Sequence, residues 1–177
     1  MIFFGHLGLT TGFIRLGEKL INKNQEKCIS IDYRYVLLGS ILPDIIDKPI
    51  GAVFFRSVFH NSRIFLHTLV FAMILIIIGL ILRGRSRAYI TIASSCCIHL
   101  ILDSMWLYPA ILFWPFFGLS FPARPEGNWI NSDFIALLTN PSIYLPEIIG
   151  FSILIFYFIT LIKRDKSGNF IKTGKII

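Results

Sequence analysis

The chain has 177 residues, of which 55% are hydrophobic and only 15% are charged. This apolar share is above that of soluble domains and the charge is below it, which argues against a soluble globular protein. The formal net charge of +7 could indicate nucleic-acid binding, but the basic residues cluster beside hydrophobic segments, as membrane topology signals do. The sequence therefore predicts an all-α integral membrane protein and no nucleic-acid partner.

The first segment carries His6 in an apolar stretch and is later interrupted by Arg15, Glu18 and Lys19. We expect a helix that either spans the membrane or lies half-buried against its neighbours. It does not resemble a cleaved signal peptide, because no basic region precedes MIFFGHLGLT and no small-x-small cleavage site follows.

The next apolar stretch, residues 35–42, is short, and Pro43 is expected to end or kink it. Asp44 and Asp47 follow this break, where carboxylates and freed backbone groups can point into a cavity. Their i, i+3 spacing lets the two carboxylates converge.

Three longer apolar runs follow, at residues 64–82, 88–107 and 142–162. The first has 19 residues, so as a helix it covers roughly 28 Å, about the thickness of the hydrocarbon core. With the two N-terminal segments, these runs predict four to five membrane-embedded helices in one domain, residues 1–162. Residues 163–177 are predicted to form a basic cytoplasmic tail.

The basic residues predict how the chain is oriented. Twelve of the 17 Lys and Arg residues form three clusters beside hydrophobic segments: Lys19, Lys23, Lys27 and Arg34; Arg83, Arg85 and Arg87; and Lys163, Arg164, Lys166, Lys172 and Lys175. The positive-inside rule places all three clusters in the cytoplasm. The predicted location is the inner or plasma membrane, with several spans.

Counting residues from the cytoplasmic ends predicts a shared site. His67 and Asp103 each lie 16 residues from the nearest basic cluster, or about 24 Å along a helix. His99 lies at about 18 Å and His6 at about 25 Å if its helix is straight. Several polar side chains therefore reach a similar depth, near the outer leaflet.

These polar side chains have the chemistry of a metal site. Ionisable groups at membrane depth usually face a bundle interior and serve a function, and imidazole with carboxylate is the usual donor set for zinc and related ions. His99 and Asp103 are four residues apart and share a helix face. His60 shares a face with His67 if their helix begins before residue 60, and otherwise lies in the entry loop. The predicted ligands are His6, Asp44, His60, His67, His99 and Asp103.

Other charged residues on the predicted outer side indicate the chemistry around the metal. Asp47 or Glu147 is the predicted catalytic proton acceptor, although a carboxylate that starts a helix also stabilises it. Four cations are predicted to bind an anionic substrate, with snorkelling to lipid headgroups as the alternative: Lys48, Arg56, Arg63 and Arg124. The aromatic-rich connection 108–141 suits either a lid over the site or an interfacial anchor.

The same pieces resemble the family of membrane-bound metal-dependent hydrolases that includes the YdjM-like inner-membrane proteins. They are GHLG, LLGSILPDIIDKP, RIFLHT and HLILD followed by LFWP, and they span residues 5–118 in the family's order. PDIID has two residues between its aspartates where many members have one, so the resemblance supports Asp44 as a ligand more than Asp47. It implies hydrolysis of a phosphoester or another bond in a lipid or lipid-linked substrate.

The donor set favours one or two zinc ions, with Mn or Mg as alternatives. Two other functions stay open at the level of the sequence. A small ion or metal transporter also places His and Asp in the membrane, although here these residues gather at one level and do not form a ladder across it. A closed four-ligand site would make the metal structural and the protein non-catalytic. The oligomeric state is not indicated.

Overall fold

The computed structural model describes residues 1–23, 28–84, 86–124 and 129–176. All regular elements within these ranges are helical. The five long helices are α1 (Phe4–Asn22), α2 (Tyr33–Lys48), α4 (Leu69–Leu82), α5 (Ala88–Leu102) and α8 (Pro141–Lys163). The shorter ones are η1 (Pro49–Phe54), α3 (Arg56–Phe59), η2 (Phe65–His67), η3 (Met105–Leu107), α6 (Pro109–Leu112), α7 (Trp129–Thr139) and α9 (Ser167–Thr173).

The long helices form a bundle in which each packs against its neighbours in space. α1 lies between α8 and α2, α2 packs on α5, and α5 pairs with α4. Small residues permit the closest contacts: a Cβ atom on Gly8 of α1 would lie 1.9 Å from the carbonyl oxygen of Gly150 on α8, and one on Gly39 of α2 would lie 2.7 Å from the carbonyl oxygen of Ile92 on α5. Such backbone contact is typical of helix pairs in membranes.

The prediction that Pro43 ends or kinks its helix is wrong as to the ending, because α2 continues through Pro43 to Lys48. Proline cannot donate a hydrogen bond to the carbonyl four residues earlier, which here belongs to Gly39. The thiol of Cys96 on α5 donates to that carbonyl oxygen instead, at 3.2 Å. A partner on another helix therefore satisfies the group that Pro43 leaves free.

Two predicted apolar helices are shorter than expected at the ends that face the candidate site. α4 begins at Leu69, because Thr68 takes an extended conformation and its hydroxyl accepts a hydrogen bond from the Phe71 N–H. α5 ends at Leu102, because Ser104 has a φ of 53°, in the left-handed region. His67 and Asp103 consequently lie just outside helices α4 and α5.

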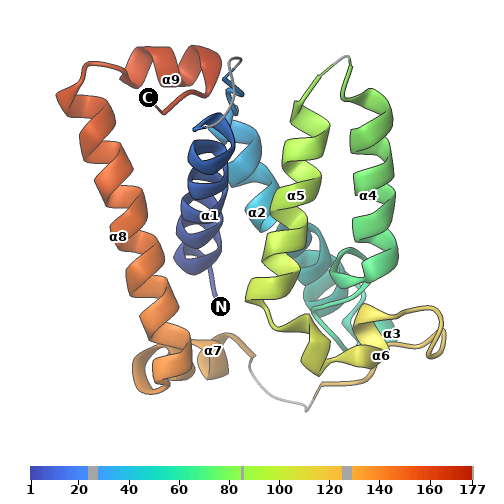
Figure 1. Cartoon of the computed structure of the whole chain (residues 1–177). Helices are drawn as coiled ribbons and strands as arrows, with labels where there is room; N and C mark the ends of the chain where they lie inside the picture. The colour runs from blue at the N-terminus through green and yellow to red at the C-terminus, as the bar shows by residue number, and fades with distance from the viewer. Residues whose placement is uncertain (24–27, 85, 125–128, 177) are drawn as a thin grey trace.

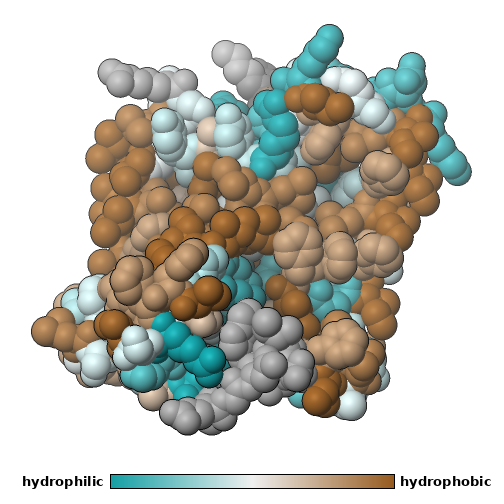
Figure 2. All heavy atoms as spheres, turned by 180° about the vertical axis from the view of Figure 1, so that it is seen from behind, coloured by the Kyte–Doolittle hydropathy of each residue, from teal (hydrophilic) through white to brown (hydrophobic). Residues whose placement is uncertain are grey.

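The outer surface of the bundle suits a membrane. Among the described residues, α8 alone is long and apolar enough to span a bilayer, with a mean hydropathy of 2.1, and α4 and α5 are apolar but shorter. Figure 2 shows a broad hydrophobic band across the middle of one face, with hydrophilic residues gathered at its two ends.

The described residues of the three predicted basic clusters gather at one end of the bundle, which we call the basic end. The ends of α1 and α8, the start of α2 and the connection between α4 and α5 lie together there (Figure 1). Lys27 and Arg85, which belong to the predicted clusters, lie outside the described residues. The candidate site occupies the opposite end, where α1 begins and α2 and α5 end.

Residues 163–177, predicted to be a tail, fold back in part on the start of α2. The Tyr33 N–H donates to the Gly174 carbonyl oxygen at 2.8 Å, and the Arg34 guanidinium donates to the Ile171 carbonyl oxygen at 2.7 Å. Ile176 is buried with Tyr33 and Val36 in a small hydrophobic cluster. The described part of this segment is thus packed on the bundle.

Candidate metal centre

Five of the six predicted metal ligands converge at the end of the bundle opposite the basic residues. The first turn of α1 supplies His6, α2 supplies Asp44 and η2 supplies His67, while His99 and Asp103 come from the end of α5. They form two overlapping groups that share His99, and the donor atoms within each group lie within 4.8 Å of one another. The convergence expected from residue counting is therefore observed.

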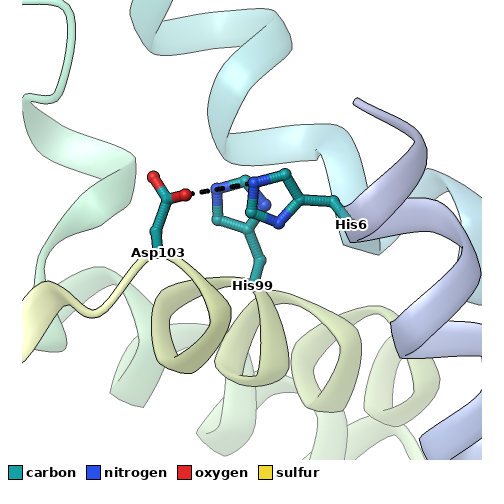
Figure 3. A group of neighbouring side chains, drawn as sticks. All are labelled: His6, His99 and Asp103. Atoms are coloured by element: carbon teal, nitrogen blue, oxygen red, sulfur yellow. Dashed lines mark ion pairs between the residues drawn. The ribbon is translucent and has the colours of Figure 1, made fainter. Parts of the chain in front are cut away.

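The distances between donor atoms suit a bound cation. The His6 Nε2 lies 3.1 Å from Asp103 Oδ1 (Figure 3), and the His67 Nε2 lies 3.4 Å from His99 Nε2 and 3.5 Å from Asp44 Oδ1. Metal–nitrogen distances of about 2.1 Å in a tetrahedral site separate the donors by about 3.4 Å. The His6 and His99 rings also stack, with centroids 4.0 Å apart.

Two of the imidazoles are held with one nitrogen free for the centre. The His67 Nδ1 lies 2.7 Å from Asp47 Oδ2, and the His99 Nδ1 lies 2.7 Å from the carbonyl oxygen of Ser40. A carbonyl oxygen and an ionised carboxylate accept hydrogen bonds but cannot donate them. In both histidines the proton is therefore on Nδ1. This leaves Nε2 as the donor atom of each ring, the arrangement usual for metal-binding histidines.

Asp47 lies behind His67. Its carboxylate accepts backbone N–H groups of Ile64, Leu66 and His67 at 3.0–3.2 Å besides the His67 ring contact, and the residue is fully buried. These bonds fix the segment that enters η2 and the orientation of the ring. Most of these contacts are made by Oδ2, and Oδ1 accepts only the Leu66 N–H at 3.2 Å, so the role of Asp47 as a proton acceptor stays a prediction.

Several buried polar atoms of the centre have no hydrogen-bond partner among the described residues: both ring nitrogens of His6, and Asp44 Oδ1. The His6 Nε2 is close to Asp103 but lacks the geometry of a hydrogen bond. Leaving a buried polar group unpaired costs about 1–3 kcal/mol, so native proteins rarely do so. A cation would satisfy acceptor atoms placed in this way, and these buried His and Asp groups could hold a metal ion.

Two of the four predicted substrate-binding cations touch candidate ligands. The Lys48 ammonium lies 2.7 Å from Asp44 Oδ2, and Arg63 Nη2 lies 2.8 Å from Asp103 Oδ2. The side chains of Lys48 and Arg63 are 29% and 19% exposed, whereas the histidines of the centre are fully buried. The accessible edge of the centre therefore lies beside Lys48 and Arg63. The N-terminal ammonium group also contacts Asp103 Oδ1, at 3.1 Å.

Four other predicted site residues belong to neither candidate ligand group. His60 is exposed, ends α3 in a left-handed conformation and belongs to neither candidate group. Arg124 is exposed and donates to the Ser62 hydroxyl at 2.8 Å, and Arg56 lies on exposed α3. Glu147 is buried, and its carboxylate accepts hydrogen bonds from the backbone of residues 2 and 3. These four residues are not in the candidate ligand groups.

Ser40 and Cys96 were missed from the sequence, although both support the centre. Ser40 orients His99 through its backbone carbonyl, and Cys96 satisfies the carbonyl that Pro43 leaves free. A contact with a main-chain acceptor cannot be recognised from residue type. The one signal in the sequence was Pro43, because a proline leaves the carbonyl four residues earlier, that of Gly39, without its helical donor.

A family model described as YdjM inner membrane protein matches residues 1–169. The match covers nearly the whole chain, so the chain belongs to this inner-membrane family, as the motifs indicated. Comparison with curated proteins and with solved structures gives no match.

Proposed function

Starting from its membership of an inner-membrane family, we propose that this chain is a membrane-embedded metal-dependent hydrolase with its centre near the outer leaflet. Residues 1–162 would form four or five membrane-embedded segments with the basic end in the cytoplasm. The hydrophobic band and the gathering of basic residues at one end support this orientation. The candidate centre lies at the opposite end.

The observation that carries the proposal is the convergence of three histidines and two aspartates with unpartnered acceptor atoms. Imidazole with carboxylate favours zinc, and Mn or Mg are the alternatives. His99 is common to both candidate groups but offers only Nε2, because its Nδ1 binds Ser40. One lone pair serves one ion, so the geometry favours a single metal over two.

A divalent ion held there would lower the pKa of a bound water and polarise the scissile group. The chain's own residues orient and bind. Asp47 holds His67 in one orientation, and Lys48 and Arg63 present positive charge at the accessible edge of the centre. Such cations bind phosphoryl oxygens and stabilise charge that develops on them.

The substrate class follows from this edge and from the membrane. An anionic group must reach a site buried in an apolar bundle, and the headgroup of a lipid or lipid-linked phosphoester already lies at that depth. We therefore propose hydrolysis of a phosphoester in such a substrate.

A structural metal is the competing function, because His6, His67 and His99 are fully buried. In favour of access, Asp44 is 11% exposed and adjoins Lys48. Substrate turnover separates the two functions, since a structural metal supports folding without turnover.

The test is release of water-soluble phosphate or headgroup from bacterial lipid extracts by the purified protein. Release should stop when the metal is chelated and return when Zn²⁺ is restored. Arg63→Met should reduce release, whereas Arg124→Met, on an exposed arginine outside the centre, should leave most of it. Stoichiometric metal without release of any soluble product would contradict hydrolysis and favour the structural function.

A further inference from the structure

Glu147 on α8 makes contacts that the proposed hydrolysis does not use. The residue is 7% exposed, so its carboxylate is largely removed from solvent. Oε1 accepts the N–H groups of Ile2 at 2.7 Å and Phe3 at 3.2 Å, and Oε2 accepts that of Phe3 at 3.2 Å. Both oxygens thus point at the backbone that leads into α1.

The start of α1 needs such an acceptor. Its N-cap residue is Phe3, whose side chain cannot accept a hydrogen bond, and α1 has no acidic residue in its first turn. The N–H groups at the start of a helix have no partner within the helix and carry partial positive charge. From another helix, Glu147 accepts the N–H of the N-cap residue Phe3, as the glutamate of a capping box does within one helix.

The reach of Glu147 depends on very close packing of α1 and α8. A Cβ atom on Gly5 would lie 2.9 Å from Glu147 Oε1, and one on Gly150 would lie 2.2 Å from the carbonyl oxygen of Phe4. Phe4 and Phe151 pack edge to face beside this contact, with ring centroids 5.1 Å apart. The first turn of α1 is therefore fixed in register against α8.

His6 is the third residue of α1, within the turn that Glu147 holds. Neither ring nitrogen of His6 has a hydrogen-bond partner among the described residues, in contrast to His67 and His99. The His6 ring is in contact with His99 and Asp103, and the backbone that carries it sets how close it comes to them. We infer that Glu147 is a positioning residue, which places His6 in the metal centre by binding the backbone N–H groups of Ile2 and Phe3.

This inference rests on the proposed metal site, and a pair of variants tests it. Glu147→Gln keeps the length of the side chain and an amide oxygen that can replace Oε1, which accepts both N–H groups. Glu147→Asp keeps the charge but draws the acceptor back by one methylene. A positioning role requires reach, so Gln should preserve the site and Asp should not. A general base requires the carboxylate, which gives the opposite order.

The measurement is Co²⁺ binding to the purified full chain, followed by the visible absorption of the bound ion and by competition with a chelator. Glu147→Gln should give the wild-type spectrum and affinity. Glu147→Asp should bind Co²⁺ about 10–100-fold more weakly and give the spectrum of His6→Ala. Ser152→Ala, an exposed residue on the same helix, is the control and should match wild type.

The inference is overturned if Glu147→Asp keeps the wild-type spectrum, or if Glu147→Gln is impaired more than Glu147→Asp in Co²⁺ affinity or hydrolysis. Wild-type protein that binds neither Co²⁺ nor Zn²⁺ would instead refute the proposed metal site itself. The two failures are therefore distinguishable.

Discussion

Buried polar clusters lie at both ends of the bundle, and their unpaired atoms differ in kind. At the basic end, Glu18 of α1 accepts hydrogen bonds from the Tyr33 hydroxyl at 2.7 Å and the Ile31 N–H at 3.1 Å, and it pairs with Arg15. The unpartnered atom in that cluster, Arg15 Nε, is a hydrogen-bond donor.

At the opposite end, the unpartnered atoms are Asp44 Oδ1 and the His6 ring nitrogens, which include acceptors. A cation can bind an unpaired acceptor such as Asp44 Oδ1, but it cannot bind an unpaired donor such as Arg15 Nε. Burial and charge alone therefore do not identify a site in this bundle; the kind of atom left unpaired does. The basic-end cluster is a structural ion pair, and the other is the candidate metal centre.

Removal of Glu18 should have the largest effect on stability and none on the metal. Glu18→Ala leaves the partly buried Arg15 without its carboxylate and removes the acceptor of the Tyr33 hydroxyl, which costs up to about 3–5 kcal/mol in free energy of unfolding. Denaturant unfolding in detergent measures the loss, and elemental analysis of the folded fraction should give the wild-type metal content. If metal content fell together with stability, the two ends of the bundle would be energetically coupled.

Removal of the metal should destabilise the other end. An ion present at 100 times its dissociation constant stabilises the folded chain by about 2.7 kcal/mol. A chelator should thus lower the thermal unfolding temperature of wild type and of Glu18→Ala by similar amounts. His99→Ala, which lacks the ligand common to both groups, should not respond. A response in His99→Ala equal to that of wild type would place the metal elsewhere.

Substitution of Asp47 should lower the affinity for the metal although Asp47 is not itself a ligand. Asp47→Asn disturbs the contact that orients the His67 ring, and loss of such a partner typically reduces metal affinity about 10–100-fold. Competition titration with a chromogenic chelator measures the change. Retained affinity with abolished hydrolysis would instead support the predicted role of Asp47 as a proton acceptor.

The smallest expected effect concerns the accessible edge. Arg63→Lys keeps the positive charge near Asp103 but loses a hydrogen bond of the planar guanidinium, and a typical hydrogen bond contributes about 1 kcal/mol. We expect KM for a phosphoester substrate to rise by about fivefold at most. Arg124→Lys should leave KM unchanged. Equal effects at both positions would contradict the claim that Arg63 contacts the substrate and Arg124 does not.

The sequence predicted which polar side chains lie together better than it predicted the bounds of the helices that carry them. Helical rise and the positions of the basic clusters placed His6, His67, His99 and Asp103 at one depth, because both signals are local. Pro43 could not be interpreted in the same way, since the donor to the Gly39 carbonyl belongs to Cys96, 57 residues from Gly39 along the chain.

His60 and Glu147 show the same limit. The two positions of His60 left open by the sequence differed only in where a helix starts, and the structure puts that start at Leu69, nine residues after His60. Glu147 has a side chain that can act as a general base, but its carboxylate accepts hydrogen bonds from the main-chain N–H groups of residues 2 and 3. Contacts with main-chain atoms across long sequence separations are not encoded in residue type.

The central claim is that His6, Asp44, His67, His99 and Asp103 form one metal centre, and metal stoichiometry tests it most directly. Elemental analysis of the protein purified from membranes should give one divalent ion per chain for wild type and for His60→Ala, and none for His99→Ala. Absence of stoichiometric metal from wild type, or an unchanged content in His99→Ala, would contradict the claim.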